Sequence, residues 1–384
     1  MTGFESRRLP ERFGGSGRPG GFEPASQRTL HARHTRPAES ALHRVLTGSA
    51  HLFQGDDYPQ LLAEAAAGTQ RAVTTGRRIA VLGTRGGAGK STVAALLARV
   101  YAAMRADAVA AVDLAPSAGT LGLLLGVPHA PPLEAAAARL GAGSPDSLRG
   151  LTALLTVAEP ANLLVTGRRR ALEPGTADGQ HSTAAAVWTP AGPQCPPAWT
   201  PASGAPDPAG APGPAGASPA ADPTAADGAT RLSRALSRYC PITIFDCGPG
   251  LTDPGTVWAL GHSHLAVFVT PASVAGVQDA VEFAGSWRHG PATAAVPLLV
   301  LVVQSSRALS ASKEARRLHR AGVDALHLGS DRHLAAGVEV LPPLLSRRTR
   351  LEAVFLASRV LAAAAPEQAF ARSAAPAAER NACA

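Results

Sequence analysis

One glycine-rich segment constrains the fold of this 384-residue chain more than any other feature: residues 82–92 read LGTRGGAGKST. It follows a short apolar run, Ile79–Gly83, which is typical of a buried parallel strand. It precedes a helical stretch, Ser91–Met104. A strand, a glycine-rich turn and a helix in this order predict a loop that binds phosphate, because glycine lets several backbone N–H groups approach an anion and the helix N-terminus adds a favourable dipole.

The polar residues of this loop indicate a nucleotide bound with Mg²⁺. We expect Lys90 to reach the β- and γ-phosphates and the Ser91 hydroxyl to hold the metal ion. The residues predicted to bind the cofactor here are Gly86, Gly87, Ala88, Gly89, Lys90, Ser91 and Thr92. The chain has 36 basic residues and only two, Lys90 and Lys313, are lysine. A compact ammonium fits between phosphates where a planar guanidinium does not, so the lysine at position 90 is explained by the chemistry of the site.

The rest of the chain alternates apolar runs with helical stretches. Expected strands lie at Ala108–Leu114, Asn162–Thr166, Ile242–Phe245, Leu265–Thr270, Pro297–Val303 and Val323–Leu328. Expected helices lie at Pro59–Ala67, Arg231–Tyr239, Ser273–Arg288, Ser310–Arg320 and Arg347–Ala365. This alternation predicts an α/β fold with an open, mainly parallel sheet and helices on both faces.

Composition divides the chain into segments. Residues 59–171 and 229–365 are expected to form one P-loop domain, between a disordered tail (1–58) and a loose C-terminal tail (366–384). Residues 172–228 hold 12 of the 33 prolines and no Lys or Arg. Such a composition predicts a flexible insertion.

A carboxylate follows the apolar run Ile242–Phe245, at Asp246. Ligands of open α/β sheets bind at the carboxyl ends of the strands. We therefore expect Asp246 to hold Mg²⁺, through water; a strand-ending Asp that caps a turn is the alternative.

The glycine-rich segment resembles the deviant Walker A motif of the MinD/ParA family, KGGxGK[ST], with Arg85 in place of the signature lysine. This resemblance implies that Arg85 crosses an ATP-bound dimer interface to the partner's phosphates, a task that suits the guanidinium fork. The segment VDLAP at 112–116 resembles the family's DxDP motif. Asp113 matches the first carboxylate, and Ala115 replaces the second, which in the family helps to position the attacking water. Hydrolysis is then expected to be slow or absent, because Ala cannot orient water.

Further segments extend the resemblance. IFDCGPG at 244–250 looks like the family's Walker B and switch segment. Gln304 stands where the family often places a residue that contacts the base, and the segment ending in Asp331 resembles the loop that frames adenine. Ordinary loop polarity is the alternative for both.

Within this family, the composition and short motifs of residues 60–171 and 229–365 most resemble those of actinobacterial MinD-like proteins encoded with type VII (ESX-like) secretion systems. The resemblance implies ATP and Mg²⁺ as cofactors, an ATP-dependent homodimer, and a protein partner in secretion or another positioning system. Three hypotheses stay open. The chain is a slow ATPase that acts as a dimer switch, a non-hydrolysing ATP-bound scaffold, or a ParA-type partition ATPase that binds DNA nonspecifically through arginines at 168–170 and 347–350.

Composition excludes other classes. The four cysteines are scattered, without a CxxC pair, which argues against a zinc ribbon or a disulfide framework and favours a reducing compartment. Aromatic residues make up 4% and the net charge of +8 is diffuse, so a dedicated single-strand-binding surface is not expected. The first residues show no apolar stretch, so we expect no signal peptide, and the longest apolar run, Ala294–Val303, is about half of what a membrane span needs. We expect a cytoplasmic protein without a transmembrane segment.

Overall fold

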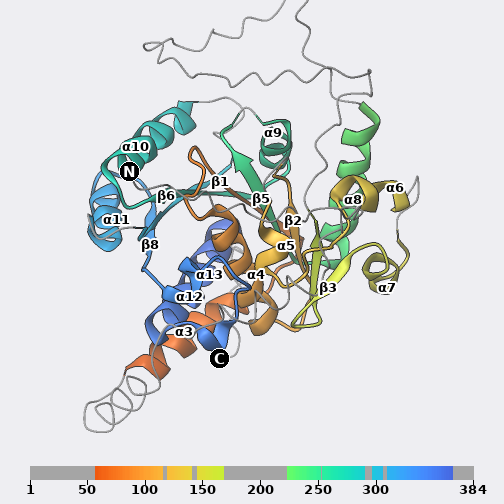
Figure 1. Cartoon of the computed structure of the whole chain (residues 1–384), viewed down its shortest axis with the longest axis horizontal. Coiled ribbons are helices and arrows are strands. Elements are labelled where there is room, and N and C mark those ends of the chain that lie inside the picture. The colour runs from red at the N-terminus through yellow and green to blue at the C-terminus, as the bar shows by residue number, and fades with distance from the viewer. Residues whose placement is uncertain are drawn as a thin grey trace, which may run out of the picture.

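A computed structural model describes residues 57–115, 119–140, 145–167, 223–251, 253–289, 296–305 and 309–365. The strands in these ranges form one sheet in the order β3-β4-β2-β5-β1-β6-β7-β8 (Figure 1). Their bounds are β1 (Arg77–Gly83), β2 (Val109–Asp113), β3 (Thr156–Ala158), β4 (Leu163–Thr166), β5 (Ile242–Pro249), β6 (Leu265–Pro271), β7 (Leu298–Val303) and β8 (Ala325–Leu328). Every pair is parallel except β3 with β4. The predicted open, mainly parallel sheet is therefore confirmed.

Helices cover both faces of this sheet. Their bounds are α3 (Tyr58–Thr69), α4 (Lys90–Met104), α5 (Leu121–Leu124), α6 (Leu133–Leu140), α7 (Leu148–Thr152), α8 (Pro223–Tyr239), α9 (Pro254–Gly261), α10 (Val274–His289), α11 (Ala311–Arg320), α12 (Arg332–Ala335) and α13 (Arg347–Ala364), with a short 3₁₀ helix at Pro342–Leu344. Figure 1 shows α3, α4 and α13 gathered on one side and α10 with α11 on the other side of the sheet.

The central strand shows why both faces are covered. Ile79 and Val81 pack into the core that includes α4 and α13, whereas Ala80 and Leu82 pack into the core that includes α8, α10 and α11. All four side chains are fully buried. A strand buried on both sides reads as a continuous apolar run, which is the pattern that the sequence shows here.

Helix α3 extends the layer formed by α4 and α13. The ring of Tyr58 lies 4.0 Å from the guanidinium carbon of Arg347. A Cβ on Gly68 would come within 1.9 Å of the Ser358 hydroxyl, so α3 and α13 touch closely at this glycine. Tyr58 and Gly68 follow one another along α3 in the same order as their partners Arg347 and Ser358 along α13. The two helices therefore run in the same direction.

The expected elements appear with small shifts, and several others were not expected. Strand β8 begins at Ala325 rather than Val323, and β3, α6, α7 and α9 had no counterpart in the prediction. Helix α8 begins at Pro223, so the end of the segment predicted as a flexible insertion is helical. Proline suits the first turn of a helix, and the buried residues Leu232 and Leu236 anchor α8 on the sheet. The remaining parts of the predicted tails and insertion lie outside the described residues.

No helix in the described part of the chain is both long and apolar enough to cross a membrane.

Candidate functional site

The glycine-rich loop links the end of β1 to the start of α4. Gly87 and Gly89 have φ values of +72° and +94°, a backbone region that side chains rarely adopt. Gly83 lies so close to β6 that a Cβ would stand 2.5 Å from the carbonyl oxygen of Val269. Helix α4 begins at Lys90, and Gly89 has no side chain to cap its first amides. These amides are consequently available to an anion at the helix N-terminus.

The side chain of Lys90 folds back over this loop. It is 8% exposed, and its Nζ donates a hydrogen bond of 2.9 Å to the carbonyl oxygen of Arg85. Burial lowers the pKa of Lys90, and the nearby Asp246 and Cys247 act in the opposite direction. The Lys90 ammonium thus lies against the backbone of the loop. A phosphate oxygen bound there could replace the Arg85 carbonyl as its hydrogen-bond acceptor.

Asp246 in β5 and Asp113 at the carboxyl end of β2 are neighbours in the sheet. The two residues pair in the parallel register, and each is at most 1% exposed. Both carboxylate oxygens of Asp246 are buried without a hydrogen-bond partner. Burial, followed by the charge of Asp113, raises the pKa of Asp246 to about 8, and Ser91 and Lys90 oppose this shift. A buried, unpartnered carboxylate beside a second one is an unfavourable arrangement that a cation would relieve.

This donor set fits Mg²⁺ rather than zinc. Within the described ranges, no group of three or more His, Cys, Asp or Glu side chains could hold a metal ion. The site instead offers Asp246 and the hydroxyl of Ser91 beside the glycine-rich loop. Mg²⁺ usually takes one or two protein oxygens and completes its shell with water and phosphate oxygens, so these residues suit it.

Asp113 is positioned by the backbone around it. Its Oδ1 accepts a hydrogen bond of 3.0 Å from the amide of Ala115, and its own amide donates to the Thr166 hydroxyl at 3.2 Å. A Cβ on Gly119 would lie 2.3 Å from Oδ2, so only glycine leaves room for the carboxylate there. Thr166 and Gly119 were not assigned a role from the sequence, because their contacts with Asp113 arise only in the folded chain.

Arg85 is held within its own chain by a residue that the sequence analysis missed. Its Nε and one terminal nitrogen bind the two carboxylate oxygens of Asp279, on α10, at 2.6 and 3.0 Å. The Thr84 hydroxyl donates to the same carboxylate at 3.0 Å. Hydrogen bonding to Arg85 lowers the pKa of Asp279 and keeps it ionised. No sequence pattern marks Asp279, since its partner lies 194 positions away.

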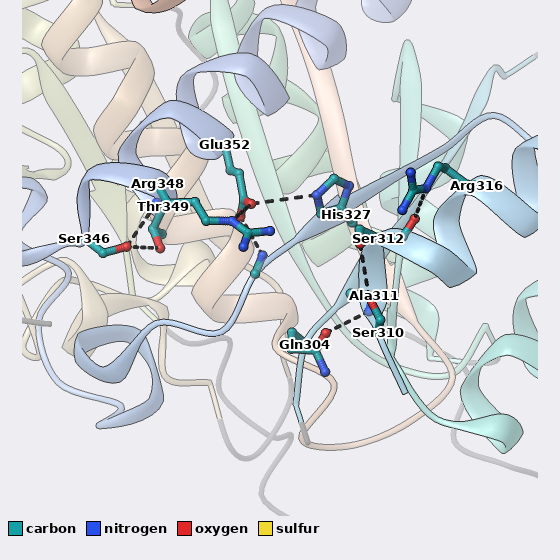
Figure 2. A network of polar contacts seen from close by, with 11 residues as sticks. Gln304, Ser310, Ala311, Ser312, Arg316, His327, Ser346, Arg348, Thr349 and Glu352 are labelled. Carbon is teal, nitrogen blue, oxygen red and sulfur yellow. Dashed lines mark hydrogen bonds and ion pairs between the residues drawn. The ribbon is translucent and has the colours of Figure 1, made fainter. Parts of the chain in front are cut away.

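Gln304 and Asp331, the residues predicted near adenine, accept hydrogen bonds from backbone amides in this structure. Figure 2 shows the Gln304 amide beside the start of α11, where its Oε1 accepts from the Ala311 amide at 2.7 Å. Asp331 caps α12 through the amide of His333 at 2.8 Å and accepts from the Ser346 amide at 3.0 Å. The role of both residues toward a base stays a prediction.

Glu352 of α13 binds both the loop that follows β8 and a neighbouring arginine of its own helix. Its Oε2 accepts from the Gly329 amide at 2.7 Å, and its Oε1 pairs with the Nε of Arg348 at 2.7 Å (Figure 2). Arg347 stacks on Tyr58, as noted above. Arg347 and Arg348, two of the three arginines at 347–350 named for DNA binding, therefore already have contacts within the chain, while the arginines at 168–170 lie outside the described residues.

Sequence comparison supports a nucleotide-binding domain. Residues 79–254 match the family model described as the CobQ/CobB/MinD/ParA nucleotide binding domain. The matched range contains the glycine-rich loop, Asp113 and Asp246. A search of curated protein sequences found no match to the chain.

Solved structures of MinD and ParA proteins are similar to this chain at low sequence identity. A ParA family ATPase from Chlorobium tepidum TLS is 16% identical, with a TM-score of 0.48 over 73% of this chain and 97% of that one. The septum site-determining protein MinD from Pyrococcus horikoshii OT3, in complex with Mg-ADP, is 15% identical, with a TM-score of 0.45 over 74% and 96%. The Aquifex aeolicus MinC:MinD complex is 12% identical, with a TM-score of 0.47 over 74% and 96%.

Proposed function

We propose that this chain is an ATP-binding protein of the MinD/ParA type that holds Mg²⁺·ATP in the loop 84–92. The observation that carries the proposal is the meeting of a loop shaped by Gly87 and Gly89 with the buried, unpartnered carboxylate of Asp246. The match of residues 79–254 to a nucleotide-binding domain supports the same function.

Each residue of the site has a defined task in this proposal. Lys90 gives its hydrogen bond to a phosphate oxygen in place of the Arg85 carbonyl, and the first amides of α4 donate to the same anion. Ser91 and Asp246 hold the metal ion, and Asp246 is ionised when it does so. Bound Mg²⁺·ATP supplies the reactive phosphoanhydride. The protein contributes position and positive charge, which dominate catalysis of phosphoryl transfer.

Residue 115 bears on the choice between a slow ATPase and a scaffold that does not hydrolyse ATP. Its backbone is fixed beside Asp113, but the Ala side chain has no group that accepts a proton or orients water. We propose slow hydrolysis within an ATP-dependent homodimer, in which Arg85 reaches the partner's phosphates. A cytoplasmic role with a protein partner, in type VII secretion or another positioning system, belongs to the same proposal.

Replacement of Lys90 tests nucleotide binding directly. We expect Lys90→Ala to weaken ATP binding at least about tenfold, because a charge-assisted bond to the phosphates is lost. The measurement is titration of the purified chain with a fluorescent ATP analogue in Mg²⁺. The matched control is Lys313→Ala, which removes the only other lysine, an exposed residue of α11, and should leave the affinity unchanged. Equal affinity of wild type and Lys90→Ala would refute the proposal.

Phosphate release distinguishes the remaining hypotheses. Turnover that Lys90→Ala abolishes would exclude the scaffold, whereas tight ATP binding without release would exclude the switch. A partition ATPase would bind DNA without sequence preference, only with ATP, and with an affinity that falls steeply with salt. Absence of DNA binding at low salt would exclude that third function.

A further inference from the structure

A polar cavity lies at the edge of the sheet opposite the glycine-rich loop. It has a volume of about 550 Å³, and it is formed by the C-terminal half of α8, the segment before β1 and the residue before β6. The seven residues of strand β1 separate this cavity from the glycine-rich loop. At about 3.3 Å per residue, a ligand in this cavity would lie about 20 Å from the loop.

Positive charge and hydrogen-bond donors dominate the walls. The side chains that matter are Thr74, Thr75, Arg78, Arg234, Arg238 and His264. None of the described residues that line the cavity is Asp or Glu. Three arginines therefore line one space without a carboxylate among its described lining residues, a composition that suits an anion.

His264 adds a neutral donor. Burial, and then the charges of Arg78 and Arg77, lower its pKa to about 4, so the ring is uncharged near neutral pH. Its Nδ1 accepts a hydrogen bond of 3.0 Å from the Arg78 amide. The single proton of the neutral ring is then on Nε2, where it can be donated.

The floor of the cavity is fixed by specific contacts. Arg78 donates from Nε to the His262 carbonyl and from a terminal nitrogen to the Ser237 hydroxyl at 2.8 Å. A Cβ on Gly76 would come within 2.5 Å of the Ser237 carbonyl oxygen, so this glycine lets the segment before β1 approach α8. These contacts hold the floor of the cavity in place without a bound ligand.

The rim is formed by two arginines one turn apart on α8. Arg234 and Arg238 are exposed, and the guanidinium carbon of Arg238 lies 5.4 Å from the centroid of the Tyr239 ring. Such side chains can close over a bound group without disturbing the core.

We propose that this cavity binds a small molecule that carries a phosphate group, separately from the ATP site. A volume of about 550 Å³ lies within the range of small-molecule sites, and the half-buried floor favours a compact ligand over a nucleic-acid backbone. The proposal does not depend on ATP binding, since it uses none of the residues of the glycine-rich loop.

Titration calorimetry with inorganic pyrophosphate tests the site. The protein is the full chain with Lys90→Ala, so that the loop does not compete; Lys90→Gln replaces it if that variant does not fold. We expect saturable binding of one pyrophosphate per chain at about 150 mM salt. Adding Arg234→Gln and Arg238→Gln should weaken it at least about tenfold, because two charge-assisted contacts are lost.

A double variant of equal charge provides the control. Arg149→Gln with Arg332→Gln removes two exposed arginines elsewhere and should change the affinity less than about twofold. The proposal fails if pyrophosphate shows no saturable binding, or if both double variants lose affinity equally. It also fails if a 20-base-pair DNA duplex binds more tightly than pyrophosphate through the same two arginines. None of these results depends on whether the loop binds ATP.

Discussion

Ala115 is the residue at which this chain departs most from the catalytic pattern of the MinD/ParA motif. It is 9% exposed, and its amide donates to Asp113 at 3.0 Å. The backbone at this position is thus fixed against the first carboxylate of the site. In the proposed ATPase, the Ala115 side chain lacks the group that would orient water, and we expect this to limit hydrolysis.

Restoring that group should raise hydrolysis. We expect Ala115→Asp to increase phosphate release about tenfold or more, since a positioned general base typically contributes about 10² or more to such rates. The measurement is steady-state phosphate release with saturating Mg²⁺·ATP. Ala115→Asn is the control, because it has the same shape without a basic carboxylate and should stay near the wild-type rate. An equal effect of Asp and Asn would show that the carboxylate is irrelevant.

Helix α4 is anchored at its middle by Arg99, whose side chain is 4% exposed. One terminal nitrogen binds Oε1 of Glu339 at 2.6 Å and the Leu125 carbonyl at 3.1 Å, and the other binds the Glu159 carbonyl. One buried guanidinium therefore joins α4 to three loops. Because α4 begins at the end of the glycine-rich loop, these contacts also fix the helix that carries Lys90 and Ser91.

Removal of the Arg99 side chain should destabilise the folded chain. We expect Arg99→Leu to lower the free energy of unfolding by about 3 kcal/mol, because several buried acceptors lose their partner. Urea denaturation followed by circular dichroism measures the change. Arg149→Leu, on the exposed surface of α7, is the matched control and should cost less than about 1 kcal/mol. Similar losses in both variants would refute a special role for Arg99.

In the whole molecule, Arg85 has two possible partners: Asp279 within its chain and, in the proposed dimer, a phosphate of the other chain. The Arg85 side chain is 48% exposed and that of Asp279 21%, so the bond contributes little to stability and can break at low cost. We therefore expect the ion pair to oppose dimer formation until ATP is bound.

Neutralising Asp279 should favour the dimer. We expect Asp279→Asn to lower the protein concentration needed for ATP-dependent dimerisation several-fold, and Arg85→Gln to prevent dimerisation, as sedimentation velocity would show. Glu282→Gln is the control, because Glu282 lies on the same helix but accepts from Gln278 at 2.7 Å. If Asp279→Asn dimerises like wild type, the ion pair has no part in the switch.

Some features were predictable because their physical cause is local. The glycines of the loop, the buried apolar run of β1 and the lysine at position 90 follow from backbone freedom, burial on two faces and phosphate chemistry. They predicted the fold class, which the structure confirms, and a phosphate site, which stays a prediction. Short elements such as β3 and α9 were missed, since their brief stretches depend on tertiary packing more than on their own periodicity.

The tertiary structure decided which side chains meet. Asp279 reaches Arg85, and Asp331 joins α12 to α13, across distances that no local pattern encodes. Likewise, the polar cavity brings Arg78 of β1 and Arg234 of α8 to one place, although they lie 156 positions apart in the chain. The sequence by itself determined the open, mainly parallel sheet and the glycine-rich turn between β1 and α4, because local chemistry dictates them. Long-range pairing and the polar cavity arise only when the strands assemble, because sheet order sets which distant residues become neighbours.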